Sequence, residues 1–519
     1  MPAARADALD VRIPVPIPGR IAMALALVSG ALLPLGLAPF DWAPLGVLAF
    51  MGMLAALWGR SPRAALLIGW CVGLGRYGVG ASWVYVSIHE HGGAPVLLAG
   101  LMVALFVAFL ALLPALAACA WSALRPDTPG RAVAALVATH VLLEWSLTWF
   151  LTGFPWLFAG YSQLGTPLAG WAPIVGLPGV SAITVATGAW FWWLLRMRGA
   201  GTAVRMTGMV IGLLWLIGAA LEPVAWTRAQ GRPLEVALVQ GAVPQELKWR
   251  NETEDFIVAR YVDLSAPHWA EADLVLWPEA ALTVYARRSG ALLDALGARA
   301  QATDTALVLG LPDYDFAPEA PREPILRNTA VALGVGEGRY VKQRLVPFGE
   351  YVPLESVLRG LIEFFNLPMS RARPGPADQA LLRIGDGIGL SMAICYEIAY
   401  GNLVRTLSAD ASVIATISND TWFGGSIGPS QHLQMAQMRA LELGKPLVRA
   451  TNDGITALVD HRGRIVDRLP RFEAGVLRGA VQPRSGRTPY ARVGDLPALC
   501  IALGLLLALM LRGARPSTG

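Results

Sequence analysis

The chain has 519 residues, of which 55% are hydrophobic and only 15% are charged, and its mean hydropathy is +0.49. Soluble proteins normally carry about 25% charged residues, so this composition excludes an entirely soluble protein and also a largely disordered one. The net charge of +5 would suit nucleic-acid binding, but the arginines lie beside apolar runs and form no basic stripe with interleaved aromatics. We therefore expect a membrane protein.

Apolar stretches long enough to cross about 30 Å of hydrocarbon dominate the N-terminal part of the chain. Acidic residues are scarce there, because only seven of the 37 precede residue 225, which leaves 37 − 7 = 30 downstream. Seven stretches precede a large polar segment and one follows it. The eight expected transmembrane helices lie near 21–40, 44–59, 64–88, 94–123, 131–151, 171–195, 206–222 and 495–511.

The arginines indicate which side of the membrane each connection faces. Connections around 41–43, 89–93 and 152–170 contain none. Because cytoplasmic loops are enriched in Lys and Arg, we expect both termini in the cytoplasm and the segment from about 228 to 490 in the periplasm of a bacterial inner membrane. The first stretch lacks a convincing signal-peptide cleavage site and is interpreted as a retained anchor. Arginines flank the other connections at Arg5, Arg12, Arg20, Arg60, Arg63, Arg125, Arg131, Arg196, Arg198, Arg205, Arg512 and Arg515.

Two charged residues, Arg76 and Glu144, lie inside expected spans. A charge in lipid is costly, so such residues pair with one another, face a cavity or reach the membrane interface. The sequence leaves these interpretations open.

The pattern changes after residue 227, which predicts three regions: a membrane domain over 1–227, a polar domain over 228–490, and a final span with a short tail over 491–519. Near-continuous apolar runs that are typical of buried strands alternate with helix-like periodicity, which indicates α/β layers. The expected strands are 234–240, 272–279, 306–312, 389–397 and 411–420. Helices are expected over 252–270, 288–303, 400–408 and 428–443, and hairpins over 328–343 and 455–469.

Several kinds of site find no support in the sequence. We find no GxxxxGK[ST] loop and no GxGxxG after a strand, so a nucleotide cofactor is not expected. The six histidines form no H-E-x-x-H pattern and have no cysteines at zinc spacing, so no metal is expected either. The polar domain contains one cysteine, Cys395, and a lone thiol in an oxidising compartment needs a reason. Taken alone, a buried structural cysteine is the simpler interpretation.

Three polar residues stand at the ends of apolar runs: Glu279, Lys342 and Cys395. Lys342 is one of only three lysines among the chain's basic residues, which suggests a use for a compact, titratable ammonium, although a surface hairpin would also accommodate it. Together the three suggest covalent catalysis, because a carboxylate can take the proton of a thiol while an ammonium stabilises the thiolate and an oxyanion. No G-x-S-x-G elbow supports a serine alternative.

Four motifs now identify a resemblance: W-P-E at 277–279, K-x-x-L-V-P-F-G-E-Y at 342–351, C-Y-E at 395–397 and S-N-D-x-W-F-G at 418–424. Their order and spacing, together with the spans, resemble the membrane-bound apolipoprotein N-acyltransferase branch of the nitrilase superfamily. The resemblance implies a four-layered αββα sandwich beside a multi-span helical domain. It also implies transfer of a phospholipid acyl chain, through a cysteine thioester, to the N-terminal amine of diacylglyceryl-modified apolipoproteins.

The resemblance also assigns roles to residues. Glu279 matches the general base, Lys342 the oxyanion-stabilising lysine and Cys395 the nucleophile. Glu350 matches a second glutamate that holds or polarises the lysine, while Tyr396 and Glu397 flank the nucleophile. Four further residues match family positions that shape the pocket, with core packing as the alternative: Trp249, Asn328, Asn419 and Trp422.

Both implied substrates are held in the outer leaflet, with phosphatidylethanolamine the expected donor, so we expect a site that opens toward the membrane. Two segments could form a lid at such a site: the apolar run 361–369 and the TWFGG run 421–425. Ordinary packing is the alternative for both.

Two rival functions remain. A membrane-tethered amidase would share the first intermediate and discharge it with water, but a soluble amide would not require seven preceding spans. A transporter or receptor would need polar residues lining its bundle, where only Arg76 and Glu144 qualify.

Overall fold

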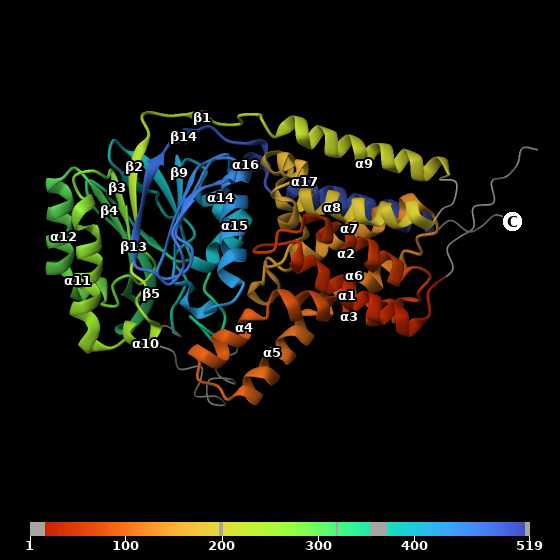
Figure 1. Ribbon diagram of the computed structural model, residues 1–519, viewed down its shortest axis with the longest axis horizontal. Helices are drawn as coiled ribbons and strands as arrows, with labels where there is room; N and C mark the ends of the chain where they lie inside the picture. Colours follow the sequence, from red (N-terminus) through yellow and green to blue (C-terminus); the bar gives the residue numbers. More distant parts are fainter. Residues whose placement is uncertain (1–15, 197–200, 318–319, 353–370, 514–519) are drawn as a thin grey trace, which may run out of the picture. The chain divides into compact units, whose positions relative to one another are not determined.

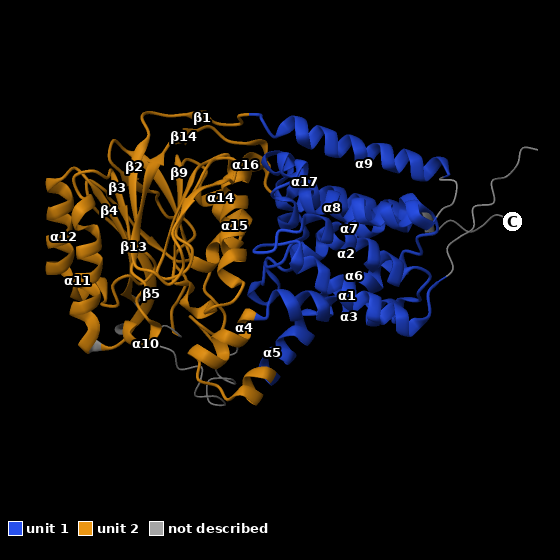
Figure 2. Ribbon diagram, in the orientation of Figure 1, with its two compact units in different colours: residues 1–82, 101–224, 495–519 blue, residues 83–100, 225–494 orange. Residues whose placement is uncertain are grey.

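A computed structural model describes residues 16–196, 201–317, 320–352 and 371–513. The chain divides into two compact units, coloured separately in Figure 2. A helical unit comprises residues 1–82, 101–224 and 495–519, and an α/β unit comprises residues 83–100 and 225–494.

Among the residues that the structure describes, three helices are long and apolar enough to cross a membrane: Val96–Ala123, Pro167–Arg196 and Thr202–Leu221. A fourth is added if Pro62–Gly80 and Val84–His91 count as one broken span, and three shorter helices are also apolar. The eight expected spans are therefore only partly matched. The helices are α1 (Gly19–Leu35), α2 (Ala43–Leu57), α3 (Pro62–Gly80), α5 (Val96–Leu110), α6 (Leu112–Ala123), α7 (Pro129–Ser146), α8 (Ala172–Arg196), α9 (Thr202–Leu221) and α17 (Leu496–Gly513).

Glycines allow α1 and α3 to pack closely. A Cβ atom on Gly30 would lie 2.0 Å from the carbonyl oxygen of Val72, and one on Gly75 would lie 2.0 Å from that of Leu27. Small residues are used in this way where helices associate in membranes, because no hydrophobic force drives lipid-facing helices together.

Arg76 and Glu144 face one another, as one interpretation of the sequence predicted. The Arg76 Nη2 atom lies 3.9 Å from Glu144 Oε1, and both side chains are buried. Arg76 donates to the carbonyl of Leu157 at 2.9 Å, and Glu144 accepts from the backbone N–H of Ala159 at 2.6 Å. The pair therefore ties the connection between α7 and α8 to α3 and α7.

The α/β unit is built on two six-stranded sheets (Figure 1). Each has three parallel strands at its centre and antiparallel strands outside them. In order, the first is β13 (Gly475–Val481), β2 (Leu234–Gln240), β3 (Leu274–Leu276), β4 (Ala306–Ala317), β5 (Ala320–Gly334) and β6 (Arg339–Val341). The second is β12 (Ile465–Arg468), β11 (Ala457–Val459), β10 (Leu447–Thr451), β9 (Val413–Ser418), β8 (Ile388–Ile394) and β7 (Leu382–Ile384).

Helices cover the outer faces of both sheets and complete four layers, αββα, as Figure 1 shows. One apolar core joins the inner faces and takes residues such as Leu238 from the first sheet and Ile394 from the second. A second core lies between the first sheet and its helices. The helices are α11 (Glu254–Ser265) and α12 (Gly290–Ala302) on the first sheet, and α14 (Gly401–Leu407) and α15 (Gly428–Leu443) on the second.

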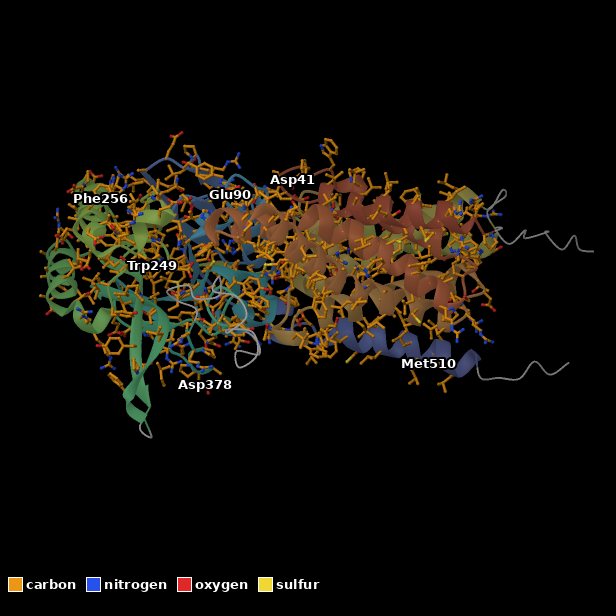
Figure 3. All side chains as sticks on the ribbon, turned by 90° about the horizontal axis from the view of Figure 1, so that it is seen from below. Asp41, Glu90, Trp249, Phe256, Asp378 and Met510 are labelled. Atoms are coloured by element: carbon orange, nitrogen blue, oxygen red, sulfur yellow. The ribbon has the colours of Figure 1, made fainter. Side chains whose placement is uncertain are left out.

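Short elements complete the α/β unit. The strands β1 (Arg228–Ala229) and β14 (Arg484–Ser485) pair with one another. The long β4–β5 hairpin extends beyond the other strands of the unit in Figure 3. The remaining helices are α4 (Trp83–Val86), α10 (Gln245–Lys248) and α16 (Pro489–Val493).

Most expected strands and helices of the polar segment are present, and both expected hairpins pair antiparallel as β5–β6 and β11–β12. Three expected strands are shorter than predicted. Strand β9 covers only Val413–Ser418, while β3 ends at Leu276 and β8 at Ile394, where the chain turns toward Glu279 and Cys395. Strands β1, β7, β10, β13 and β14 were not predicted. The segment 361–369 lies outside the described residues.

Candidate active site

Glu279, Lys342 and Cys395 each follow the end of a strand in the α/β unit. Glu279 stands three residues after β3, Lys342 directly after β6 and Cys395 directly after β8. Sites in α/β proteins are commonly built at such strand ends, where side chains leave the sheet. Lys342 lies 2.9 Å from Glu279, and Glu397 accepts from the N–H groups of Ile394 and Gln343, the neighbours of Cys395 and Lys342, so the structure brings the three together.

Lys342 links two carboxylates. Its ammonium Nζ lies 2.9 Å from Glu279 Oε1 and 2.9 Å from Glu350 Oε1. The amide of Asn328 joins the same two oxygens, donating at 2.7 Å to each. All four side chains are buried, and Lys342 is only 1% exposed. A buried lysine with two carboxylates carries one net negative charge, and its donors hold both acids in place.

Each carboxylate is also held through its second oxygen. Glu279 Oε2 accepts from the backbone N–H of Asn419 at 2.9 Å, and Glu350 Oε2 accepts from that of Val346 at 2.8 Å. Buried carboxylates need such partners, because an unsatisfied polar atom away from water is costly. The cluster therefore has little freedom to rearrange.

The pKa values in this cluster are set by competition between burial and charge. Burial alone would raise the pKa of Glu279, but the charge of Lys342 and the hydrogen bonds from Lys342 and Asn328 hold that pKa below its ordinary value. Burial alone would lower the pKa of Lys342, but the charges of Glu279 and Glu350 raise it well above its ordinary value. Glu279 is therefore an anion and Lys342 a cation at neutral pH.

Cys395 occupies a strained turn. Its φ of +53° lies in the left-handed region, which costs a residue with a side chain free energy and is common at functional sites. Cys395 is partly accessible, whereas its charged neighbours are buried. Loss of hydration and the charge of Glu279 raise its pKa above the ordinary thiol value, while Lys342 opposes this shift. The resting group is therefore a thiol beside an ionised carboxylate.

Glu397 joins the turn of the cysteine to the loop of the lysine. Its Oε2 accepts from the backbone N–H of Ile394 at 2.7 Å. Its Oε1 accepts from the N–H of Gln343 at 2.6 Å, from that of Arg344 at 3.1 Å and from the hydroxyl of Tyr340 at 2.9 Å. Burial raises the pKa of Glu397 to about 7, against the effect of these donors. The side chain fixes the separation of the two loops.

The other expected residues lie at different distances from the cluster. Asn328 and the backbone of Asn419 touch it directly, and Tyr396 is buried with its ring edge-on to Tyr400 at 5.3 Å. Within the described residues, neither Trp249 nor Trp422 hydrogen-bonds to the cluster through its side chain. Trp249, labelled in Figure 3, follows α10.

The TWFGG segment is held by packing within the α/β unit. Phe423 is buried, and its ring lies edge-on to that of Trp83 at 4.7 Å. Ser87 donates to the carbonyl of Trp422 at 2.7 Å. These contacts favour the packing interpretation for Phe423, while Trp422 stays partly exposed.

Sequence reasoning missed several residues that surround the three strand ends. Lys248 is fully buried and donates to the carbonyl of Glu279 at 3.2 Å, and burial lowers its pKa to about 8. The rarity of lysine was a usable signal, because all three lysines of the chain are buried. Asp420 and His432 were also missed, although Asp420 lies inside a motif that the sequence analysis quoted.

Nothing in the described part of the chain gathers three or more His, Cys, Asp or Glu side chains in a position to hold a metal ion.

Comparison with known proteins identifies the family to which the chain belongs. Residues 29–190 match the family model "Apolipoprotein N-acyltransferase N-terminal domain" and residues 235–490 match "Carbon-nitrogen hydrolase". The apolipoprotein N-acyltransferase of Pseudomonas syringae pv. tomato is 45% identical over 96% of this chain and 98% of its own length. The apolipoprotein N-acyltransferase of Azotobacter vinelandii is 46% identical over 95% of this chain and 96% of its own length. An amidase structure from Nesterenkonia sp. is 22% identical over 52% of this chain and 95% of its own, with a TM-score of 0.33.

Relatives of this identity match the chain from end to end, and both family models fit consecutive parts of it. The chain belongs to the apolipoprotein N-acyltransferase family, and it is a membrane acyltransferase that acts in lipoprotein N-acylation.

Proposed function

We propose that this enzyme transfers acyl chains through a thioester on Cys395, in two half-reactions that share one cluster of buried charges. The observation that carries the proposal is the double bridge between Glu279 and Glu350, made by Lys342 and Asn328 beside the cysteine turn. It supplies a fixed base for the proton of the thiol and a fixed cation for the negative charge that develops during acyl transfer.

In the first half-reaction the Cys395 sulfur attacks the ester carbonyl of a phospholipid. Because the resting thiol is protonated, its proton passes to the Glu279 carboxylate as the C–S bond forms. The Lys342 ammonium stabilises the negative charge that develops on sulfur and on the carbonyl oxygen. The ester C–O bond then breaks, the lysophospholipid leaves with the proton from Glu279, and the acyl chain remains as a thioester.

In the second half-reaction the N-terminal amine of a lipoprotein attacks the thioester. Its pKa as a free α-amine is about 7.7–8.0, so a fraction is neutral and reactive near neutral pH. Glu279 accepts the surplus proton of the attacking nitrogen and returns a proton to the departing sulfur. An amide replaces a thioester, which is energetically downhill, so no nucleotide is needed.

Glu350 and Glu397 have positioning roles in this proposal. Glu350 holds the Lys342 ammonium through a second contact at 2.9 Å, in addition to that of Glu279, which keeps the lysine charged and directed. Glu397 keeps the cysteine turn and the lysine loop in register through four hydrogen bonds. Tyr396, Trp249, Asn419 and Trp422 are proposed to shape the surrounding pocket.

The substrates and the setting follow from the same proposal. We take phosphatidylethanolamine as the donor and the diacylglyceryl-modified N-terminal cysteine of apolipoproteins as the acceptor. The arginine distribution supports a bacterial inner-membrane protein with cytoplasmic termini, eight spans and a periplasmic domain over 228–490. Membrane-tethered hydrolysis is the alternative, because water could discharge the same thioester.

A two-stage experiment separates transfer from hydrolysis. The purified enzyme is first loaded with phosphatidylethanolamine and then given a diacylglyceryl-cysteinyl peptide, the same peptide with an acetylated amine, or buffer alone. We expect rapid discharge only with the free amine and an N-acylated peptide as product. Equal discharge in all three arms would support the hydrolase and contradict the proposed transfer.

A further inference from the structure

The carbonyl group of Cys395 receives a hydrogen bond from a residue outside the proposed triad. His432, on α15, places its Nε2 atom 3.0 Å from the Cys395 oxygen. A carbonyl oxygen only accepts, so Nε2 carries the hydrogen. His432 has no exposed surface, and its ring packs near that of Phe423 at 5.9 Å.

The opposite edge of the His432 ring is held by two charged residues. Its Nδ1 lies 3.0 Å from Asp420 Oδ1 and 3.1 Å from Arg449 Nη2. Arg449 also donates to Asp420 Oδ2 at 2.7 Å, and Ser418 donates to Asp420 Oδ1 at 2.5 Å. Ser418, Asp420, His432 and Arg449 are all buried. Residues of β9, β10 and the loop after β9 therefore hold the ring at its Nδ1 edge.

This arrangement gives the same hydrogen bond to Cys395 in either protonation state of the ring. A neutral ring accepts from Arg449 at Nδ1, and a charged ring donates to Asp420 at Nδ1. In both states Nε2 keeps its hydrogen and donates to the Cys395 oxygen.

The hydrogen bond acts on a residue whose backbone is strained. Cys395 has a φ of +53°, and a conformation of this kind persists only where surrounding contacts impose it. The contacts on either side of this residue are complementary. Glu397 holds the N–H of Ile394 before it, and His432 holds the carbonyl group after its Cα atom.

We propose that His432, backed by Asp420 and Arg449, is a positioning residue that holds the Cys395 turn in its left-handed conformation and so directs the thiol at the acyl carbonyl. This inference rests on the proposed thioester route. His432 takes no proton from substrate and is not a catalytic residue in this account.

Two amide substitutions separate the two edges of the ring. His432→Gln places an amide nitrogen near the position of Nε2 and keeps the donor to Cys395. His432→Asn places it near Nδ1, which keeps a polar contact to Asp420 but leaves the Cys395 carbonyl without this donor. The matched control is Gln437→Leu, because Gln437 on the same helix donates to the carbonyl of Gly463 at 2.9 Å, a bond of the same kind at another position.

The measurement is the single-turnover rate of Cys395 acylation by phosphatidylethanolamine, with its saturation constant and the thermal unfolding midpoint of each variant. We expect His432→Asn to lower the maximal rate about 100-fold, as misplacement of a reacting group does, with little change in the saturation constant. His432→Gln should stay within a few-fold of the native rate, and Gln437→Leu should match it.

Equal rates for the Asn and Gln variants, or an equal loss in Gln437→Leu, would overturn the positioning role while leaving the thioester route intact. Absence of acylation in the native chain would instead overturn the thioester route, and this inference with it.

Discussion

Two of the protein's buried charged clusters, one in each unit, are built differently. In the α/β unit the lysine contacts two carboxylates at 2.9 Å, and each carboxylate has further donors on both oxygens. In the helical unit Arg76 and Glu144 are 3.9 Å apart, and their shorter hydrogen bonds go to the backbone of the α7–α8 connection.

The partners of these hydrogen bonds indicate a different role for each cluster. In the helical unit the shortest hydrogen bonds of Arg76 and Glu144 go to backbone groups, and Glu144 also contacts the His140 side chain at 3.2 Å. Such backbone contacts are how a structural pair secures a connection. Lys342 donates its hydrogen bonds to two glutamate side chains, Glu279 and Glu350, near a thiol. The same charges therefore serve architecture in one unit and, in our proposal, chemistry in the other.

The largest expected effect is that of Glu279→Gln. The amide cannot accept the thiol proton, so we expect the acylation rate to fall on the order of 10³-fold or more. The check is single-turnover acylation by mass spectrometry, with the unfolding midpoint as the control for folding. A folded variant that keeps a tenth of the native rate would remove Glu279 from the role of base.

Glu350→Gln should have an intermediate effect. The variant keeps an acceptor for Lys342 but loses one of the two negative charges that hold it, and a hydrogen bond to a charged group is worth about 1.5–3 kcal/mol. We expect the acylation rate to fall about 10- to 100-fold. A loss as large as that of Glu279→Gln would assign Glu350 a more direct part in the reaction.

The pH dependence should divide the two half-reactions. The pKa of Glu279 is held below its ordinary value, so the base stays ionised and acylation should remain supported as the pH falls from 8 toward the ordinary carboxyl range. Transfer requires a neutral amine and should fall about tenfold for each pH unit below 7.7–8.0. Separate rates for loading and discharge test this, and a parallel decline of both would contradict it.

Glu144→Gln should have the smallest effect on chemistry. The amide oxygen can still accept from Ala159, but Arg76 loses the negative charge it faces, which we expect to lower stability by about 1–3 kcal/mol. The activity per folded molecule should be unchanged, as measured beside the unfolding midpoint in detergent. A loss of turnover without a loss of stability would mean that this cluster is more than structural.

Local patterns predicted much of the α/β unit. The run LEVALVQ forms β2 over Leu234–Gln240, and the expected helix over 428–443 is α15. Strand β10 was missed because it buries Arg449, whose charge interrupts the apolar pattern that marks a buried strand. Its partner Asp420 lies 29 residues away in the chain, so the reason for burying that charge is visible only in three dimensions.

The candidate site likewise has features that the sequence indicated and features that only the fold shows. Residue types and their places at strand ends pointed to Glu279, Lys342 and Cys395, and the resemblance to a family added Glu350 and Asn328. The left-handed conformation of Cys395 and the contact from His432 have no local sequence signal, because each depends on elements that meet only after the sheets have formed.

The intact mass of the purified protein after incubation with phosphatidylethanolamine shows whether Cys395 carries the acyl chain. We predict a mass increase of one acyl chain that hydroxylamine removes and that Cys395→Ala does not show. Absence of the adduct in folded, lipid-bound native protein, or an equal adduct in Cys395→Ala, would contradict the account.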